Sequence, residues 1–208
     1  SHSDFDNTIC LLNWGNANEY FNKDWHPMHF ADMAKWLAPA KVSFACSAYY
    51  VDQIDAVNLT EEQQKFLKDI PDLQFRQSVR DFMVNQQFRR DYWVKGLRKL
   101  TPLDQADQMR SQRLLLVSDA ADVSLKFNGA LGEVNMSETV YKPILELMSD
   151  HKIRTVAQIE SAVKGKGINF AQLMQAILLL SGVGHMAAAQ DDAVISKVKK
   201  NSDKLNQH

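Results

Sequence analysis

DFMVNQQFRRDYWVKG, residues 81–96, joins a helical spacing of apolar residues to a basic pair and a group of aromatic residues. Apolar side chains recur at helical intervals from residue 75 to residue 83, which predicts a helix from Asp72 to Gln86. Residues 88–94 are rich in aromatic and β-branched side chains, which predicts a strand. This part of the chain is therefore expected to mix helices with a small sheet.

The paired arginines of this stretch, Arg89 and Arg90, allow two interpretations. In the first, residues 89–91 form a solvated charged face while Phe88, Tyr92 and Val94 fill the core. In the second, the arginines contact an anion or a protein partner, because a guanidinium can donate two parallel hydrogen bonds to one carboxylate. The stretch alone does not decide between them.

Periodicity and capping signals divide the rest of the first half. Thr60-Glu61-Glu62-Gln63 has the capping-box pattern and opens a helix that runs to about Asp69. Polar, unpatterned residues follow Leu100, so Thr101–Asp107 is predicted to be a loop or a seam between domains. The remaining predicted elements are a helix over Thr8–Phe21, a helix over Met28–Ala38 that ends near Pro39, and a strand over Val42–Ala48.

The second half has a different pattern. Leu114–Val117 is a wholly apolar run, typical of a buried strand. Residues 123–127 alternate strictly, and Asn128-Gly129 is a turn signal, so a β-hairpin returning through Leu131–Met136 is predicted. Four helices and one short extended piece follow: Thr139–Asp150, Thr155–Val163, Asn169–Leu180, Met186–Ala189 as the extended piece, and Asp191 to about Leu205.

Together these elements predict an α+β protein with two domains. Residues 1–104 would form a mixed α/β domain with a small sheet. Residues 105–208 would contain the β-hairpin and a winged-helix-like helical domain.

Composition limits the possible functions. The 208 residues are 45% hydrophobic and carry a formal net charge of −1, so the chain can form a core and has no overall field that attracts nucleic acid or an anionic membrane. No apolar run is long enough to span a membrane. Cys10 and Cys46 lie in apolar settings, which suits reduced residues of a cytoplasmic protein, and the alternative is a single disulfide between them. Because the sequence starts at Ser1 rather than Met, we expect the natural polypeptide to begin upstream.

Catalytic motifs are missing from the sequence. It contains no G-x-G-x-x-G or phosphate-binding loop, no H-E-x-x-H or C-x-x-C metal spacing, and no G-x-S-x-G nucleophile elbow. His26 and His29 are three residues apart near Asp24 and Asp32, but Pro27 lies between them, which disfavours a metal site. The sequence thus predicts a chain that binds rather than one that catalyses.

Aromatic and arginine side chains are the types enriched at energetically important protein contacts. As a set they favour a protein partner. The winged-helix prediction raises DNA binding as an alternative, but the candidate recognition helix over Asn169–Leu180 has no Lys or Arg to read bases. The predicted partner-binding residues are Trp25, His26, Tyr49, Tyr50, Arg89, Arg90, Tyr92 and Trp93.

Three elements resemble the predicted methyltransferase regulatory domain. They are Trp25-His26-Pro27-Met28-His29-Phe30 with Met33-Ala34 after it, Leu37-Ala38-Pro39-Ala40-Lys41-Val42-Ser43-Phe44 with Ser47-Ala48 after it, and Asp81-Phe82 through Phe88-Arg89-Arg90-Asp91. They occur in the same order as in the family, and the resemblance covers residues 16–100.

The resemblance implies an accessory region of a class I S-adenosylmethionine-dependent methyltransferase, similar to bacterial protein-lysine methyltransferases. It implies that no catalytic or cofactor-binding residue lies in this chain and that S-adenosylmethionine binds to the associated catalytic domain. The expected partners are an upstream methyltransferase domain and a protein substrate, with a homo-oligomer as a further possibility.

Overall fold

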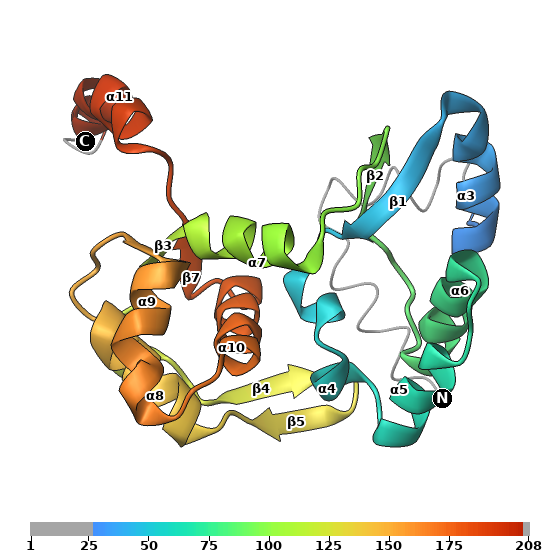
Figure 1. The fold of residues 1–208 in the computed structure, drawn as a ribbon, viewed down its shortest axis with the longest axis horizontal. Helices are drawn as coiled ribbons and strands as arrows, with labels where there is room; N and C mark the ends of the chain where they lie inside the picture. Colours follow the sequence, from blue (N-terminus) through green and yellow to red (C-terminus); the bar gives the residue numbers. More distant parts are fainter. Residues whose placement is uncertain (1–26, 206–208) are drawn as a thin grey trace, which may run out of the picture.

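The computed structural model describes residues 27–205. The predicted helix over Thr8–Phe21 and the predicted site residues Trp25 and His26 lie outside this range. Figure 1 shows two groups of elements, with α7 (Pro102–Ser111) between them. The first group contains α3, α5, α6 and the strands β1 and β2, and the second contains α8, α9 and α10 with a three-stranded sheet.

The first group is built on an antiparallel pair of strands, β1 (Val42–Ser47) and β2 (Asp91–Lys95). The Phe30 ring of α3 (Phe30–Leu37) packs on Phe44 of β1 and Trp93 of β2, with ring centroids 5.0 and 5.4 Å away. This aromatic contact joins the helical layer to the strand pair. The other elements of the group are η1 (Ala38–Ala40), η2 (Tyr50–Gln53), α4 (Asp55–Asn58), α5 (Glu61–Lys68) and α6 (Leu73–Met83).

Local signals locate most of these elements correctly. The α3 helix and the β1 strand confirm the predictions, and Thr60 forms the predicted capping box with Gln63 at the start of α5. The helix predicted to reach Gln86 is wrong at its carboxyl end, because α6 stops at Met83 and Asn85 takes a left-handed backbone conformation with φ of 51°. Likewise β2 begins at Asp91 and not at Phe88.

The second group surrounds a sheet in the order β6-β3-β7, with both pairs antiparallel. The central strand β3 contains most of the apolar run predicted to be a buried strand, and Leu114 and Leu116 are buried. The prediction is wrong at Val117, which lies after the strand and is 50% exposed. After β7 the chain passes directly into α11, which stands away from the other helices in Figure 1. The elements are β3 (Arg113–Leu116), η3 (Ala120–Asp122), β4 (Lys126–Gly129), β5 (Gly132–Asn135), α8 (Glu138–Met148), β6 (Arg154–Thr155), α9 (Val156–Val163), η4 (Lys164–Lys166), α10 (Phe170–Gly182), β7 (Met186–Ala188) and α11 (Asp192–Leu205).

The main core crosses the predicted boundary at residue 104. Val51, Ile54 and Val57 from the first half are buried in one apolar cluster with the side chains of α8, α9 and α10. Position 104 itself lies in the first turn of α7. The division into two domains at this point stays a prediction.

Among residues 27–205, no helix combines the length and the hydropathy needed to cross a membrane.

The loop predicted over Thr101–Asp107 is wrong. Thr101 caps α7 by accepting from the amide of Asp104, and Pro102 occupies the first helical position, where a missing N–H has no cost. Arg110 anchors the other end of α7 by a bidentate ion pair with Glu160 of α9, at 2.8 and 3.2 Å. No residue of α7 is buried, so its cap and this charged contact stabilise the helix in place of a buried apolar face.

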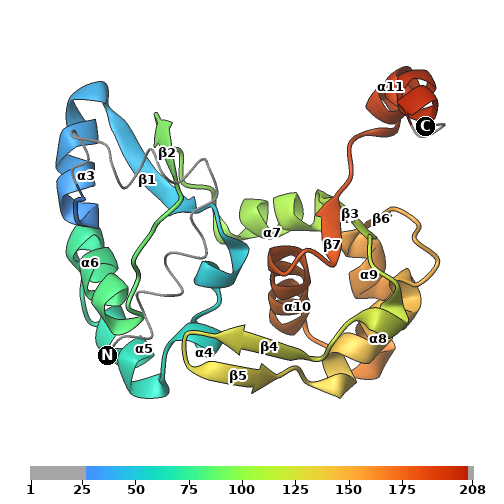
Figure 2. The same ribbon diagram turned by 180° about the vertical axis from the view of Figure 1, so that it is seen from behind.

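The β-hairpin is confirmed, but its turn lies two residues later than the predicted turn at Asn128-Gly129. Gly129 pairs with Gly132, so Ala130-Leu131 forms the turn. Both views place the hairpin beside α4 (Figure 2). The Ala130 amide donates to the Asn58 side chain at 3.4 Å, and the Asn58 amide donates to the carbonyls of Val51 and Ile54 at 2.8 and 3.0 Å. Gly129 therefore provides a close approach to α4 and not the turn itself.

Tyr141 on α8 makes the free energy of unfolding depend on pH in the alkaline range. Its ring is 6% exposed, and burial raises the pKa of its hydroxyl from 10.0 to about 12. The folded state then holds this proton more tightly than the unfolded state. The resulting stabilisation is fully present below about pH 10 and is lost as the pH rises toward 12.

We therefore expect the free energy of unfolding of the wild type to fall by roughly 2–3 kcal/mol between about pH 10 and pH 12. Tyr141→Phe has no hydroxyl to titrate and should not show this fall. Urea unfolding followed by circular dichroism across this range measures the difference. Tyr92→Phe is the matched control because Tyr92 is 58% exposed, and its pH profile should follow that of the wild type. Parallel pH profiles for Tyr141→Phe and the wild type would contradict the assignment.

Candidate functional site

Arg89 is the centre of an ion cluster between α6 and β2. Its guanidinium donates to Asp81 at 2.5 Å, to both oxygens of Asp91 at 2.8 and 3.1 Å, and to Gln77 at 3.0 Å. The same group lies 4.4 Å from the centre of the Phe30 ring, within cation–π distance. The side chains of Arg89, Asp81 and Asp91 are only 18%, 17% and 8% exposed. The cluster thus holds the carboxyl end of α6 against the strand pair.

Burial and charge act against each other in this cluster. Burial raises the pKa of Asp81 above its ordinary value, and the positive charge of Arg89 offsets only part of that rise. For Arg89, burial acts to lower the pKa, but the hydrogen bonds to Asp91 and the charges of Asp81 and Asp91 raise it overall. Arg89 consequently stays charged and supplies the positive charge that the two largely buried carboxylates require.

The two interpretations of residues 88–94 can now be compared with the structure. The solvated-face interpretation is wrong for four residues. Arg89 and Asp91, which it places at the surface, are largely buried. Phe88 and Tyr92, which it places in the core, are 65% and 58% exposed. Strand alternation explains the result: Asp91 and Trp93 share the face toward α3, and Tyr92 points to the opposite face. The anions that Arg89 contacts are carboxylates of this chain. Its predicted contact with a partner stays a prediction.

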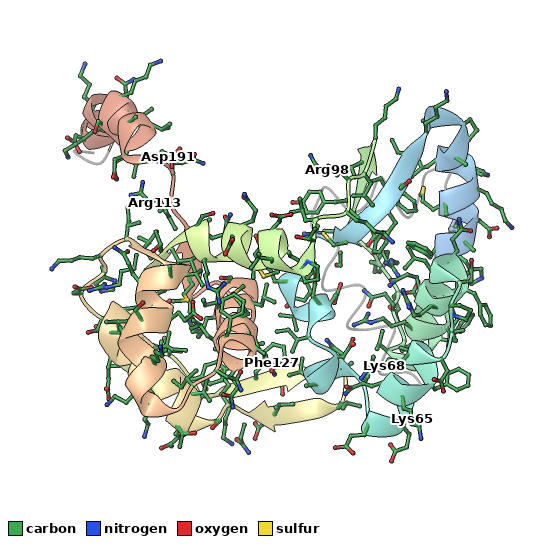
Figure 3. The ribbon with its side chains drawn as sticks, in the orientation of Figure 1. Lys65, Lys68, Arg98, Arg113, Phe127 and Asp191 are labelled. Carbon is green, nitrogen blue, oxygen red and sulfur yellow. The ribbon has the colours of Figure 1, made fainter. Side chains whose placement is uncertain are left out.

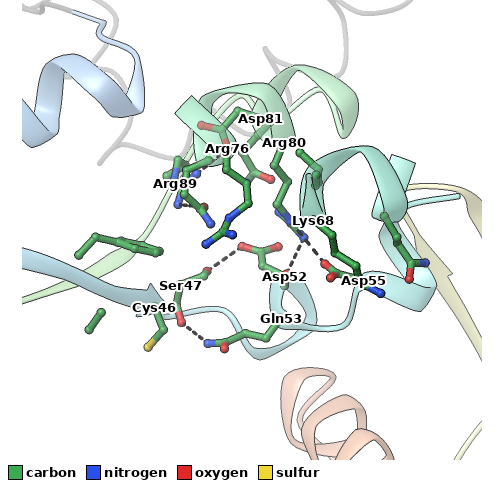
Figure 4. Close-up of a pocket in the computed structure, with 16 residues that line it drawn as sticks. Cys46, Ser47, Asp52, Gln53, Asp55, Lys68, Arg76, Arg80, Asp81 and Arg89 are labelled. Atoms are coloured by element: carbon green, nitrogen blue, oxygen red, sulfur yellow. Dashed lines mark hydrogen bonds and ion pairs between the residues drawn. The ribbon is translucent and has the colours of Figure 1, made fainter. Parts of the chain in front are cut away.

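A polar pocket of about 330 Å³ adjoins the ion cluster, as Figure 4 shows. It lies between the end of β1, the η2 and α4 turns, and the helices α5 and α6. Its charged lining residues are Asp52, Asp55, Lys68, Arg76, Arg80, Asp81 and Arg89.

Most polar groups around this pocket are paired with each other. The Ser47 hydroxyl donates to Asp52 at 2.8 Å, and Arg80 donates to the Asp52 carbonyl while facing the Asp55 carboxylate at 3.8 Å. Arg76 is different, because the carbonyl of Ile70 accepts from it at 3.5 Å and no carboxylate among residues 27–205 forms an ion pair with it. In Figure 4 its guanidinium points into the pocket, toward Ser47 and Asp52.

The structure brings several predicted partner-binding residues to one end of the β1–β2 pair. The Ala48 amide donates to the Arg90 carbonyl at 2.7 Å, which places Tyr49 next to Arg90. Tyr92 pairs with Cys46 in the strand register. We call the exposed residues Tyr49, Tyr50, Arg90 and Tyr92 the tyrosine–arginine surface. Trp93 is not part of it, because its ring is half-buried against Phe30 and Phe44.

Sequence reasoning missed the pocket residues Ser47, Asp52, Arg76 and Arg80. One signal was available, since Arg76 and Arg80 are four residues apart and therefore share a face of α6. The opposite wall comes from Ser47 and Asp52, whose approach depends on the η2 turn, and no sequence pattern indicated that turn. No group of three metal-ligating side chains lies together within the described part of the chain.

A family model matches part of the first half of the chain. Residues 17–95 match the family described as the predicted methyltransferase regulatory domain. Over 190 residues, 91% of this chain, the sequence is 37% identical to the uncharacterized protein sll1526 of Synechocystis sp.. This chain spans 37% of that relative's length, so it matches only part of a longer protein.

Solved structures give the fold comparison. PKMT2 from Rickettsia typhi matches 90% of this chain with a TM-score of 0.60 and 14% identity. The same protein in complex with AdoHcy matches 91% with a TM-score of 0.56 and 13% identity. In both cases the match spans 41% of the PKMT2 chain. At this identity the likeness concerns the fold alone. The match over residues 17–95 confirms the resemblance to the predicted methyltransferase regulatory domain that was noted in the sequence.

Proposed function

We propose that this chain is a non-catalytic accessory region of an S-adenosylmethionine-dependent methyltransferase that modifies a protein. The family match over residues 17–95 carries the proposal. The fold shared with part of PKMT2, a protein-lysine methyltransferase, supports a protein as the methyl acceptor. S-adenosylmethionine would bind to the catalytic domain, because this sequence contains no glycine-rich turn of the kind that holds such a cofactor.

The accessory region would act by protein contact through the tyrosine–arginine surface. Tyr49, Tyr50 and Tyr92 are 46%, 47% and 58% exposed, although large aromatic side chains are usually more buried. Tyrosine and arginine are the residue types that contribute most to binding at protein interfaces. Arg90 offers its guanidinium to a carboxylate of the catalytic domain or of the protein substrate.

The alternative, a winged-helix DNA-binding regulator, has no comparable support. The helix that would enter the major groove is α10, and it is buried along one side through Leu173, Ala176, Ile177 and Leu180. Its other residues include no Lys or Arg. A salt-dependent shift of duplex DNA at micromolar protein would revive this alternative.

Replacing two residues of the tyrosine–arginine surface should impair methylation. We expect Arg90→Ala with Tyr92→Ala to lower the rate of protein methylation by the intact methyltransferase by about 10-fold or more, since truncating an interface hot spot weakens binding by about 2 kcal/mol. Transfer of radiolabelled methyl groups to the protein substrate measures the rate.

The matched control is Lys65→Ala with Phe66→Ala, which removes an exposed cation and a 55% exposed aromatic ring from α5. This control should methylate at the wild-type rate. Equal rates for the two double variants would contradict the assigned surface. Binding of S-adenosylmethionine by this chain alone, seen as a thermal shift, would contradict the non-catalytic assignment.

A further inference from the structure

Two of the cations that line the polar pocket, Lys68 and Arg76, have no carboxylate partner among residues 27–205, although the carboxylates in and beside the pocket balance its cations in number when Asp91 is included. Arg89 is held by Asp81 and Asp91, and Arg80 faces Asp55. The remaining charged groups of the lining are Lys68, Arg76 and Asp52, two cations and one anion. Within residues 27–205, neither Lys68 nor Arg76 forms an ion pair with a carboxylate. The unpaired guanidinium of Arg76 is therefore the group in this pocket that can bind an anion.

Hydrogen-bond donors from α5 and α6 line this pocket. Arg76 points into the pocket from α6 (Figure 4). The neighbouring Gln77 side chain accepts from Arg89 through its oxygen, so its NH₂ group remains a donor. Lys68 contributes an ammonium to the lining, and Figure 3 labels it on α5 together with Lys65. A guanidinium, an amide and an ammonium together match the acceptor oxygens of a carboxylate.

We propose that this pocket binds a small carboxylate ligand of amino-acid size, with its carboxylate on Arg76 and Gln77 and with Lys68 at the rim. A volume of about 330 Å³ suits a small molecule. Asp52 lies on the opposite wall, where one carboxylate oxygen accepts from Ser47. It is placed to receive an ammonium group, so the ligand is either a plain carboxylate or an amino acid. This site is independent of the proposed contact with a methyltransferase domain.

Two probes of similar size test the site on the full chain. L-Glutamate carries an ammonium and two carboxylates, and glutarate carries the carboxylates alone. We expect at least one of them to bind with a Kd of about 1 mM or lower, measured by calorimetry and by shifts of the amide resonances of α6. A higher affinity for L-glutamate that Asp52→Asn abolishes would identify an amino acid. Equal affinities for both probes would identify a plain carboxylate.

Arg76→Met should weaken binding by about 10-fold or more, because it removes a charge-assisted pair of hydrogen bonds. Arg98→Met is the matched control, since Arg98 is exposed beyond β2 and away from the pocket (Figure 3), and it should bind like the wild type. Lys68→Met changes an exposed residue that should not affect folding, and it should weaken binding several-fold. The proposal is overturned if neither probe binds up to about 10 mM. It is also overturned if folded Arg76→Met or Lys68→Met binds with unchanged affinity.

Discussion

Gly129→Ala should lower the free energy of unfolding by about 3 kcal/mol or more, which is the upper part of the range for overpacking a core. A Cβ atom at this position would lie 2.2 Å from the carbonyl oxygen of Val57. That oxygen belongs to the backbone of α4, so no side chain can rotate away to make room. The strand and α4 would have to separate. Urea unfolding monitored by circular dichroism measures the loss.

Gly165→Ala is the matched control for this substitution. A Cβ atom on Gly165 would meet nothing within 4 Å, and its backbone does not have the positive φ that favours glycine. Its free energy of unfolding should stay within about 0.5 kcal/mol of the wild type, as is usual for surface substitutions. If the two variants unfold at the same denaturant concentration, the close approach of β4 to α4 is not as the structure has it.

The contact at Gly129 matters because it joins the two halves of the chain. Asn58 lies beside it and is 7% exposed, with hydrogen bonds to the η2 turn and to the hairpin. A second glycine, Gly182 of α10, allows a similar approach to Val51, where a Cβ would meet the valine side chain at 2.5 Å. The family-matched segment thus packs on the second half at two points where only glycine fits.

Short-range signals explain why much of the fold was predictable. Capping boxes at Thr60, Thr155 and Asn169 begin α5, α9 and α10, and each lies within four consecutive residues of the sequence. The apolar run that contains most of β3 was identified because consecutive apolar residues are typical of a buried strand, and Leu114 and Leu116 are buried. Such features depend on neighbours in the sequence and need no knowledge of tertiary contacts.

Features that depend on distant residues were not predictable. Asn128-Gly129 has the sequence of a turn, but Gly129 pairs in the strand because α4 passes close to it. The α7 helix depends on a partner 50 residues away, the bond from Arg110 to Glu160. The polar pocket needs η2 to bring Asp52 toward Ser47, opposite α6.

The ion cluster at Arg89 is an intermediate case. Asp81 and Asp91 both occur in the same sixteen-residue stretch as Arg89, so the opposite charges were visible in the sequence. Their pairing requires the chain to reverse after α6, and Asn85 makes this possible with φ of 51°. Asparagine tolerates this conformation better than most residues, but its presence alone does not fix the direction of the next strand.

Arg89→Met should destabilise the fold by about 2–4 kcal/mol at neutral pH, because removing one partner of a largely buried ion pair leaves uncompensated charge. Asp81 and Asp91 would remain 17% and 8% exposed with no cation in contact. Methionine retains much of the length of arginine, so loss of packing contributes little to the change. Arg90→Met is the matched control: Arg90 is the adjacent arginine and is exposed, and its stability should stay within about 0.5 kcal/mol of the wild type.

The pH dependence distinguishes lost charge compensation from lost packing. Burial already raises the pKa of Asp81, and removing Arg89 takes away the charge that lowers it, so the pKa rises further in the variant. A carboxyl whose folded pKa lies above its unfolded pKa contributes stability below the unfolded pKa and loses it as the pH rises through the folded pKa. The deficit of Arg89→Met relative to the wild type should therefore be largest near neutral pH and should shrink as the pH falls through the raised pKa of Asp81 in the folded variant. A deficit that stays constant with pH would show that Arg89 acts through packing, and its four hydrogen bonds would then not be the reason for its place in the fold.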